Sequence, residues 1–180
     1  MAKKVFISLG AIVGIAVLVI AVLASMAPTD LYVERQVLIE KPKDVVFSEL
    51  KLVKNHDLWS PWFKKDPNLV KEYKGEDGTV GFVSAWSGND EVGVGEQEIK
   101  SIKEGERIDY ELRFMKPMED TSAAWLITEA LDENQTKVKW GMRGKTPFPG
   151  NVICMVMNMR QKLAADFDEG LGMLKKHLEQ

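Results

Sequence analysis

The strictest pattern in the chain is the alternation of charged and apolar side chains over residues 107–114, RIDYELRF. Ile108, Tyr110, Leu112 and Phe114 share one side of an extended segment, whereas only charged residues share the other side. Because successive side chains of a β-strand point to opposite faces, this period of two predicts a strand with one buried and one solvated face. Such one-sided strands are typical of antiparallel sheets.

Five further stretches carry strand patterning, and turn residues separate several of them. They are residues 31–39, 79–86, 91–102, 121–130 and 136–143. In 121–130 the pattern predicts Trp125 and Ile127 together on the packed face. Near the C-terminus the period changes, and apolar residues step by threes and fours. This spacing predicts one amphipathic helix of about 28 residues from Val152, with a bend permitted near Gly170. The helix would cover the packed face of the sheet.

Between the first strand and the others lies a short helical pattern that begins after Pro42. The helical connection that follows it is expected to end at Ser60, because the residue before a proline is pushed out of the α region. The sequence then reads LWSPWFKKDPN over 58–68 and concentrates Trp59, Trp62 and Phe63 within five positions. We interpret this aromatic cluster as the lid or plug of an internal cavity, or as a contact surface.

The N-terminal region contains 23 consecutive residues, 5–27, without any charge. As a helix they would extend over roughly 34 Å, which is enough to cross the hydrocarbon core of a bilayer. The alternative is a cleaved signal peptide with Ser25 and Ala27 before the cut. The apolar run is longer than a signal peptide requires, and Pro28 would obstruct cleavage. We therefore predict an uncleaved transmembrane helix over 5–27.

This anchor sets the predicted organisation: a basic flank (1–4), the transmembrane helix, a linker (28–30) and one globular domain (31–180). Lys3 and Lys4 keep the N-terminus cytoplasmic, so the domain is expected on the extracytoplasmic side, which is the periplasm if the cell is Gram-negative. Gly10 and Gly14 have the spacing of a weak self-association motif. Residues 29–180 hold 22 basic and 27 acidic side chains, and this net charge of −5 argues against nucleic-acid binding.

Residues suited to catalysis are few. Only His56, His177 and Cys154 could supply imidazole or thiol groups, and they lack metal-binding spacing, so no metal or cofactor is expected. Arg35 and Glu129 interrupt apolar stripes, and we interpret them as candidate buried polar groups. A pair of carboxylates, Glu96 and Glu98, share one strand face; we expect them in solvent if their neighbours face inward.

Three stretches together resemble the SRPBCC superfamily: VERQVLIEKPKDVVFSEL, WSPWFKKDP, and DFDEGLGMLKKHLE after FPGN. This superfamily includes START lipid-transfer domains, the birch-pollen allergen family, polyketide cyclases and dehydrases, and Hsp90-activator homologues. The resemblance covers residues 31–178 and is greatest to the polyketide-cyclase-like members. It implies an α+β helix-grip fold, with a seven-stranded antiparallel curved sheet wrapped on a long C-terminal helix and two short helices after strand 1. It also implies that Trp59, Trp62 and Phe63 border a cavity between sheet and helix.

The resulting hypothesis is a membrane-anchored, non-catalytic domain that binds an apolar small molecule or lipid in this cavity. The alternatives are a polyketide cyclase or dehydrase and a protein-interaction module resembling Hsp90-activator homologues. An enzyme would need a buried titratable group such as Tyr110. The candidate cavity residues are large and apolar: Trp59, Trp62, Phe82, Trp86, Tyr110, Phe114, Trp125, Trp140, Met159 and Leu163.

Overall fold

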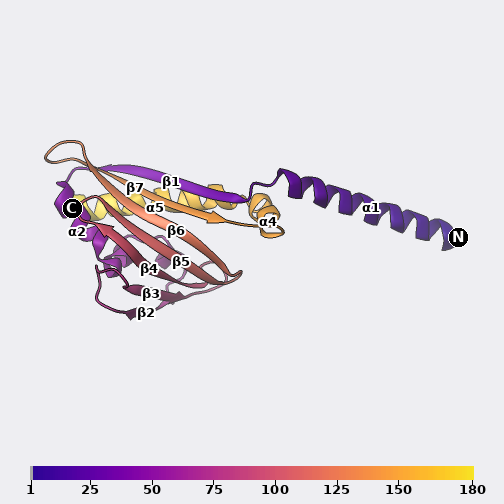
Figure 1. Cartoon of the computed structure of the whole chain (residues 1–180), viewed down its shortest axis with the longest axis horizontal. Helices are drawn as coiled ribbons and strands as arrows, with labels where there is room; N and C mark the ends of the chain where they lie inside the picture. Colours follow the sequence, from indigo (N-terminus) through magenta and orange to yellow (C-terminus); the bar gives the residue numbers. More distant parts are fainter. Residues whose placement is uncertain (1) are drawn as a thin grey trace.

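The computed structural model describes the backbone of residues 2–180, together with the side chains of Ile12, Gly14, Ile15 and residues 17–180. Met1 and the other side chains before position 17, including those of Lys3, Lys4 and Gly10, lie outside this description. The first element, α1 (Ala2–Met26), projects away from the rest of the molecule (Figure 1). Among the described residues, no helix combines the length and apolar content needed to cross a bilayer. The predicted transmembrane helix over 5–27 is therefore not supported.

Seven antiparallel strands form a single sheet in the order β1-β7-β6-β5-β4-β3-β2. Their bounds are β1 (Asp30–Ile39), β2 (Val70–Lys74), β3 (Val83–Ser87), β4 (Val94–Lys103), β5 (Arg107–Lys116), β6 (Asp120–Ala130) and β7 (Thr136–Lys145). The predicted seven-stranded antiparallel sheet is confirmed. The edge strand β2 had no recognisable pattern of its own, because most of its side chains are exposed on both faces.

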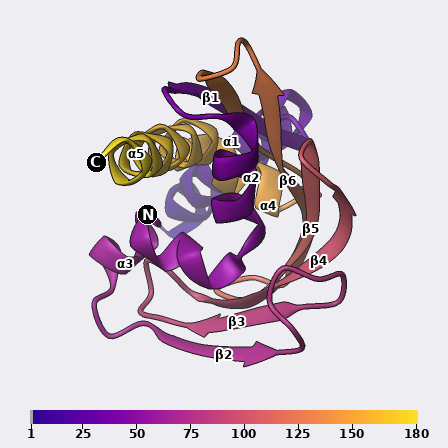
Figure 2. The same ribbon diagram turned by 90° about the vertical axis from the view of Figure 1, so that its left-hand side faces the viewer.

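Three short helical segments follow β1: α2 (Lys43–Lys51), the 3₁₀ helix η1 (Val53–Leu58) and α3 (Trp62–Lys65). The C-terminal segment forms α4 (Gly150–Val156) and α5 (Met159–Glu179). Figure 2 shows the sheet curving around α2 and α5, so that both helices lie on its concave side. A long C-terminal helix gripped by a curved antiparallel sheet is the predicted α+β helix-grip arrangement.

The C-terminal helix is interrupted at a different place from the one expected. The chain breaks at Asn158, which has a left-handed backbone conformation with φ of 52°. Asparagine tolerates this conformation better than most residues, so it can separate two helices. Gly170 instead lies within α5, where an added Cβ would approach Trp140 to 2.8 Å. This glycine serves close packing between helix and sheet, and the predicted uninterrupted helix from Val152 is wrong.

The core lies between the concave face and the helices. Ile108 and Tyr110 of β5, Val138 of β7, and Phe167 and Leu171 of α5 are all at most 4% exposed. The period-two face of β5 and the helical stripe of α5 therefore pack into the same core, as the sequence predicted. α5 lies along β1 and touches β7 at one edge of the sheet.

Candidate functional site: the concave face of the sheet

An aromatic cluster fills the space between α5 and the sheet. The rings of Trp140 (β7) and Phe167 (α5) stack with centroids 4.2 Å apart and an angle of 7°. Trp59 and Trp62 meet Trp140 edge-on, at centroid distances of 5.4 Å and 5.6 Å. Such stacked and edge-to-face contacts are favoured aromatic geometries. Trp59 is 1% exposed, so it plugs this side of the fold and is no exposed contact surface.

A small polar group lies next to this plug. The ring of His56 is 4.7 Å from that of Trp59 and 6.2 Å from that of Tyr110. The His56 Nε2 atom lies 2.8 Å from the Leu50 carbonyl oxygen, which accepts a hydrogen bond from it. Burial lowers the pKa of His56 to about 4 and raises that of the Tyr110 hydroxyl. Both groups are therefore uncharged at neutral pH, and the lowered pKa makes His56 a weaker base than an exposed histidine.

The Trp59 indole N–H is buried and has no hydrogen-bond partner among the described residues. Leaving a buried donor unsatisfied costs roughly 1–3 kcal/mol. Such groups are rare in folded proteins, and each one calls for an explanation. The predicted lid residue thus combines a structural role with an unused donor.

The concave face is less well covered toward β3, β4 and β5. Trp86 and Phe114 meet there edge-to-face with centroids 5.8 Å apart, and both are half-buried, as is Leu112. The strand between them carries Gly95, whose absent side chain makes room for the Trp86 ring: an added Cβ would lie 2.6 Å from it. Since α5 lies along the opposite edge, over β1 and β7, these apolar side chains keep partly accessible surface.

Trp125 faces the other side of the sheet, so its predicted place in the cavity is wrong. Its neighbours Ala124 and Leu126 are the β6 residues that join the core. On the outer face Trp125 lies over Gly141, packs against Tyr32 at a centroid distance of 5.9 Å, and donates from Nε1 to Glu34. It is 8% exposed because these neighbours cover it.

The two candidate buried polar groups are not buried. Arg35 has a 42% exposed side chain and pairs with Asp168 of α5 at 3.1 Å. Glu129 has a 40% exposed side chain and pairs with Lys137 and Lys139 of β7 on the outer face. Each charge is tolerated in an apolar stripe because it forms an ion pair at the surface. Neither side chain is therefore available as a catalytic group inside the fold.

Glu96 and Glu98 lie on the outer face, where both accept hydrogen bonds from the Arg113 guanidinium. This network lowers the pKa of Glu98 and raises that of Arg113. Their neighbour Ile99 is fully buried. The interpretation of the two carboxylates as solvent-facing residues is confirmed.

The remaining predicted cavity residues occupy different depths. Phe82 is 1% exposed and stacks on Tyr73, whereas Leu163 is half-buried and Met159 is 36% exposed near the start of α5. Sequence reasoning did not count Phe167 or Leu112 among the cavity residues. Both lie on the apolar faces already recognised in α5 and β5, so their periodicity was the signal that could have found them.

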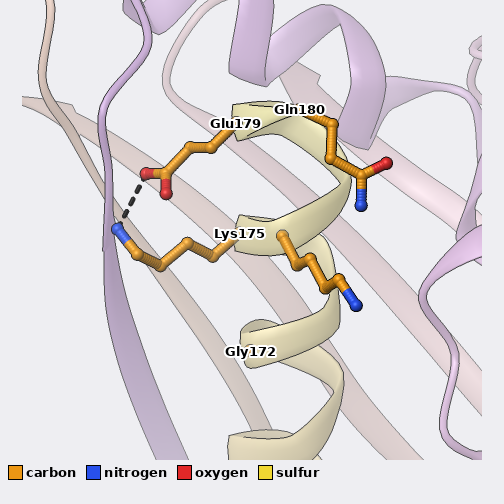
Figure 3. A pocket seen from close by; sticks show the side chains of 5 residues that line it. Gly172, Lys175, Glu179 and Gln180 are labelled. Atoms are coloured by element: carbon orange, nitrogen blue, oxygen red, sulfur yellow. Dashed lines mark hydrogen bonds and ion pairs between the residues drawn. The ribbon is translucent and has the colours of Figure 1, made fainter.

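The pockets on the described part of the chain include two that none of the ten predicted cavity residues lines. One is a shallow surface hollow of about 360 Å³ at the end of α5, lined by Gly172, Lys175, Lys176, Glu179 and Gln180 (Figure 3). Lys175 there bonds Glu179 at 2.7 Å and also the Leu38 carbonyl, so its side chain ties α5 to β1. The other, of about 170 Å³, lies among Pro28, Leu31, α4 and the start of α5. It is smaller than the roughly 300 Å³ typical of ligand pockets.

No protein-family profile and no curated protein matches the sequence. The fold, in contrast, is similar to that of many solved structures. Protein CV1439 from Chromobacterium violaceum aligns with a TM-score of 0.60 at 13% identity, over 83% of this chain and 98% of its own. Ara h 8.0201 aligns with a TM-score of 0.54 at 18% identity, over 81% and 97%. DynU16, a protein of the dynemicin biosynthetic locus, aligns with a TM-score of 0.56 at 15% identity, over 83% and 48%. The chain therefore has a helix-grip fold.

Proposed function

We propose that this protein is a membrane-tethered helix-grip domain that binds an apolar small molecule or lipid against the concave face of its sheet. The observation that carries the proposal is that Trp86, Leu112 and Phe114 are only partly buried on the concave face, away from the edge that α5 covers. Completely burying one such side chain is worth about 1.5–3 kcal/mol. A ligand that covers all three gains a useful share of that free energy.

Further features support a ligand of this kind. On α5, Leu163 packs against the core and is partly exposed, and Met159 one turn before it is 36% exposed. Methionine adapts readily to ligands of different shape. DynU16, one of the similar structures, belongs to a biosynthetic locus, which is in keeping with a small-molecule ligand.

The membrane tether is proposed from the sequence of the first helix alone. Residues 5–27 carry no charge, and α1 continues as one helix through Met26. In the tethered arrangement Lys3 and Lys4 stay cytoplasmic and the domain lies on the far side of the membrane. Tethering would hold the binding face beside a hydrophobic source at high effective concentration.

Native mass spectrometry of residues 27–180 tests the binding proposal. This fragment contains the whole sheet and retains the contact of Ala27 with Asn151. It should carry a discrete extra mass that extraction with organic solvent removes and that returns when mixed phospholipids and aromatic compounds are offered. Replacing Trp86 or Phe114 by alanine should reduce the retained mass.

The matched control is Tyr32→Ala, which removes an exposed aromatic side chain from the outer face. It should retain the extra mass at the wild-type level. A clean protein mass that stays unchanged after every compound is offered would refute the proposal. The concave aromatic residues would then serve packing only.

A further inference from the structure

Large apolar side chains are exposed at the end of the domain beside α1. Phe148, Ile153, Val156 and Met157 lie in α4 or immediately beside it, and they are 60%, 42%, 66% and 48% exposed. Met118, in the turn between β5 and β6, is 46% exposed. We call these five residues the apolar corner. A soluble domain rarely leaves so many large apolar side chains on one short helix and its neighbouring turn without a partner.

The register of the sheet places these residues at the same end of the domain. Ser122 of β6 pairs with Gly144 of β7, so the turn before β6 and the segment after β7 leave the sheet together. Hydrogen bonds then fix this segment to the end of α1: Thr146 N donates to the Thr29 carbonyl at 2.8 Å. Asn151 Nδ2 donates to the Ala27 carbonyl at 3.1 Å. Figure 1 shows α4 beside the point where α1 meets the domain.

The connection between α1 and the sheet is short. Helix α1 ends at Met26 and β1 begins at Asp30, which leaves residues 27–29 between them. Three extended residues span at most about 10 Å, and Ala27 is held in place by burial at 5% exposure. If α1 crosses a bilayer, the apolar corner must therefore lie at the bilayer surface.

Basic side chains surround the apolar corner. Five exposed ones lie on the neighbouring strand ends and the start of α5, and none of them forms an ion pair with another described residue; they are Lys116, Arg143, Lys145, Arg160 and Lys162. The acidic residues at this corner are Asp30, Glu119 and Asp120, and Asp120 accepts a hydrogen bond from Ser122. This local excess of positive charge contrasts with the net charge of −5 over residues 29–180.

We propose that the apolar corner docks onto a bilayer containing anionic phospholipid, with its apolar side chains among the acyl chains and its basic neighbours at the headgroups. Apolar residues bordered by Lys and Arg are what interfacial binding to anionic lipid requires. The inference rests on the membrane tether of the proposed function. It adds a second contact, which fixes how the concave face is oriented toward the membrane.

The full-length chain, reconstituted into phosphatidylcholine vesicles with roughly 30% of the anionic lipid phosphatidylserine, provides the test. Cys154 is the only cysteine, so a Cys154→Ser background accepts a single environment-sensitive fluorophore. The fluorophore is placed at position 156 through Val156→Cys and, as a matched control, at position 131 through Leu131→Cys. Leu131 is a 47% exposed apolar residue that follows β6 at the opposite end of the sheet.

We expect the fluorophore at position 156 to shift to the blue and to be quenched several-fold more by bromine-labelled lipid than the one at position 131. Charge reversal by Lys145→Glu with Arg160→Glu should lower this quenching at least twofold. Vesicle flotation distinguishes the docking proposal from the membrane tether. If the chain floats with the vesicles but both positions are quenched equally, docking is overturned while the tether stands. If the chain fails to float, both are overturned.

Discussion

Removing the Phe167 side chain tests whether the α5 side of the concave face is a packed plug. Phe167 is 2% exposed and stacks on Trp140 at 4.2 Å. Truncating a buried phenylalanine to alanine costs roughly 3–5 kcal/mol, which includes the cavity left behind. In double-mutant cycles, aromatic pairs such as Phe167 and Trp140 contribute about 0.5–1.5 kcal/mol to stability. A fold of this size loses roughly 2–4 °C in Tm per kcal/mol, so Phe167→Ala should lower Tm by about 6–20 °C.

Phe114→Ala is the matched control, because it removes the same side chain from the half-buried part of the same face. We expect a loss of about 1–2 kcal/mol, in proportion to the smaller area buried. Both variants of residues 27–180 are compared with wild type by thermal unfolding followed in the near-ultraviolet circular dichroism, which reports packed aromatic rings. Equal Tm shifts for the two variants, or a shift below about 3 °C for Phe167→Ala, would refute the division into a packed and an accessible part.

Two further predictions concern single residues. Burial holds the pKa of His56 at about 4, below its ordinary 6.5, so the unfolded chain binds more protons between these values and stability falls as pH drops from 6.5 to 4. The loss in the free energy of unfolding amounts to as much as about 3 kcal/mol. Urea unfolding at several pH values should show a weaker pH dependence of this free energy in His56→Gln and an unchanged one in His177→Gln. Equal pH profiles for both variants would contradict the assignment. Gly141→Ala would place a Cβ 2.2 Å from the Trp125 ring and should cost about 1–3 kcal/mol. Gly172→Ala meets no atom within 4 Å and should raise stability by about 0.5–1 kcal/mol instead; a Gly141→Ala protein as stable as wild type would show that Trp125 is not packed as described.

The aromatic residues predicted for the concave face show when sequence periodicity can predict the buried face of a strand and when it cannot. The alternation of β5 has charges on one side only, so it identified Tyr110, Leu112 and Phe114 as inward residues without help from any neighbour. The same argument failed for β6, where apolar residues occur on both faces. Periodicity then does not indicate which face of β6 points into the core, and the packing of the neighbouring strand decides it. Trp125 pairs with Gly141, and only that side of the sheet has space for its ring.

The sequence by itself determined the elements whose two faces differ in polarity: the one-sided strands, the helical stripe of α5 and the uncharged run over 5–27. Burial follows from such contrasts because apolar side chains leave water wherever the chain permits it. Only the tertiary structure decided that Asn158 divides the C-terminal helix, that Arg35 and Glu129 find solvated partners, and that the aromatic plug leaves one part of the concave face half-buried. These outcomes depend on contacts between residues far apart in the sequence, such as the ion pair of Arg35 with Asp168. The local pattern of polar and apolar residues does not identify such partners.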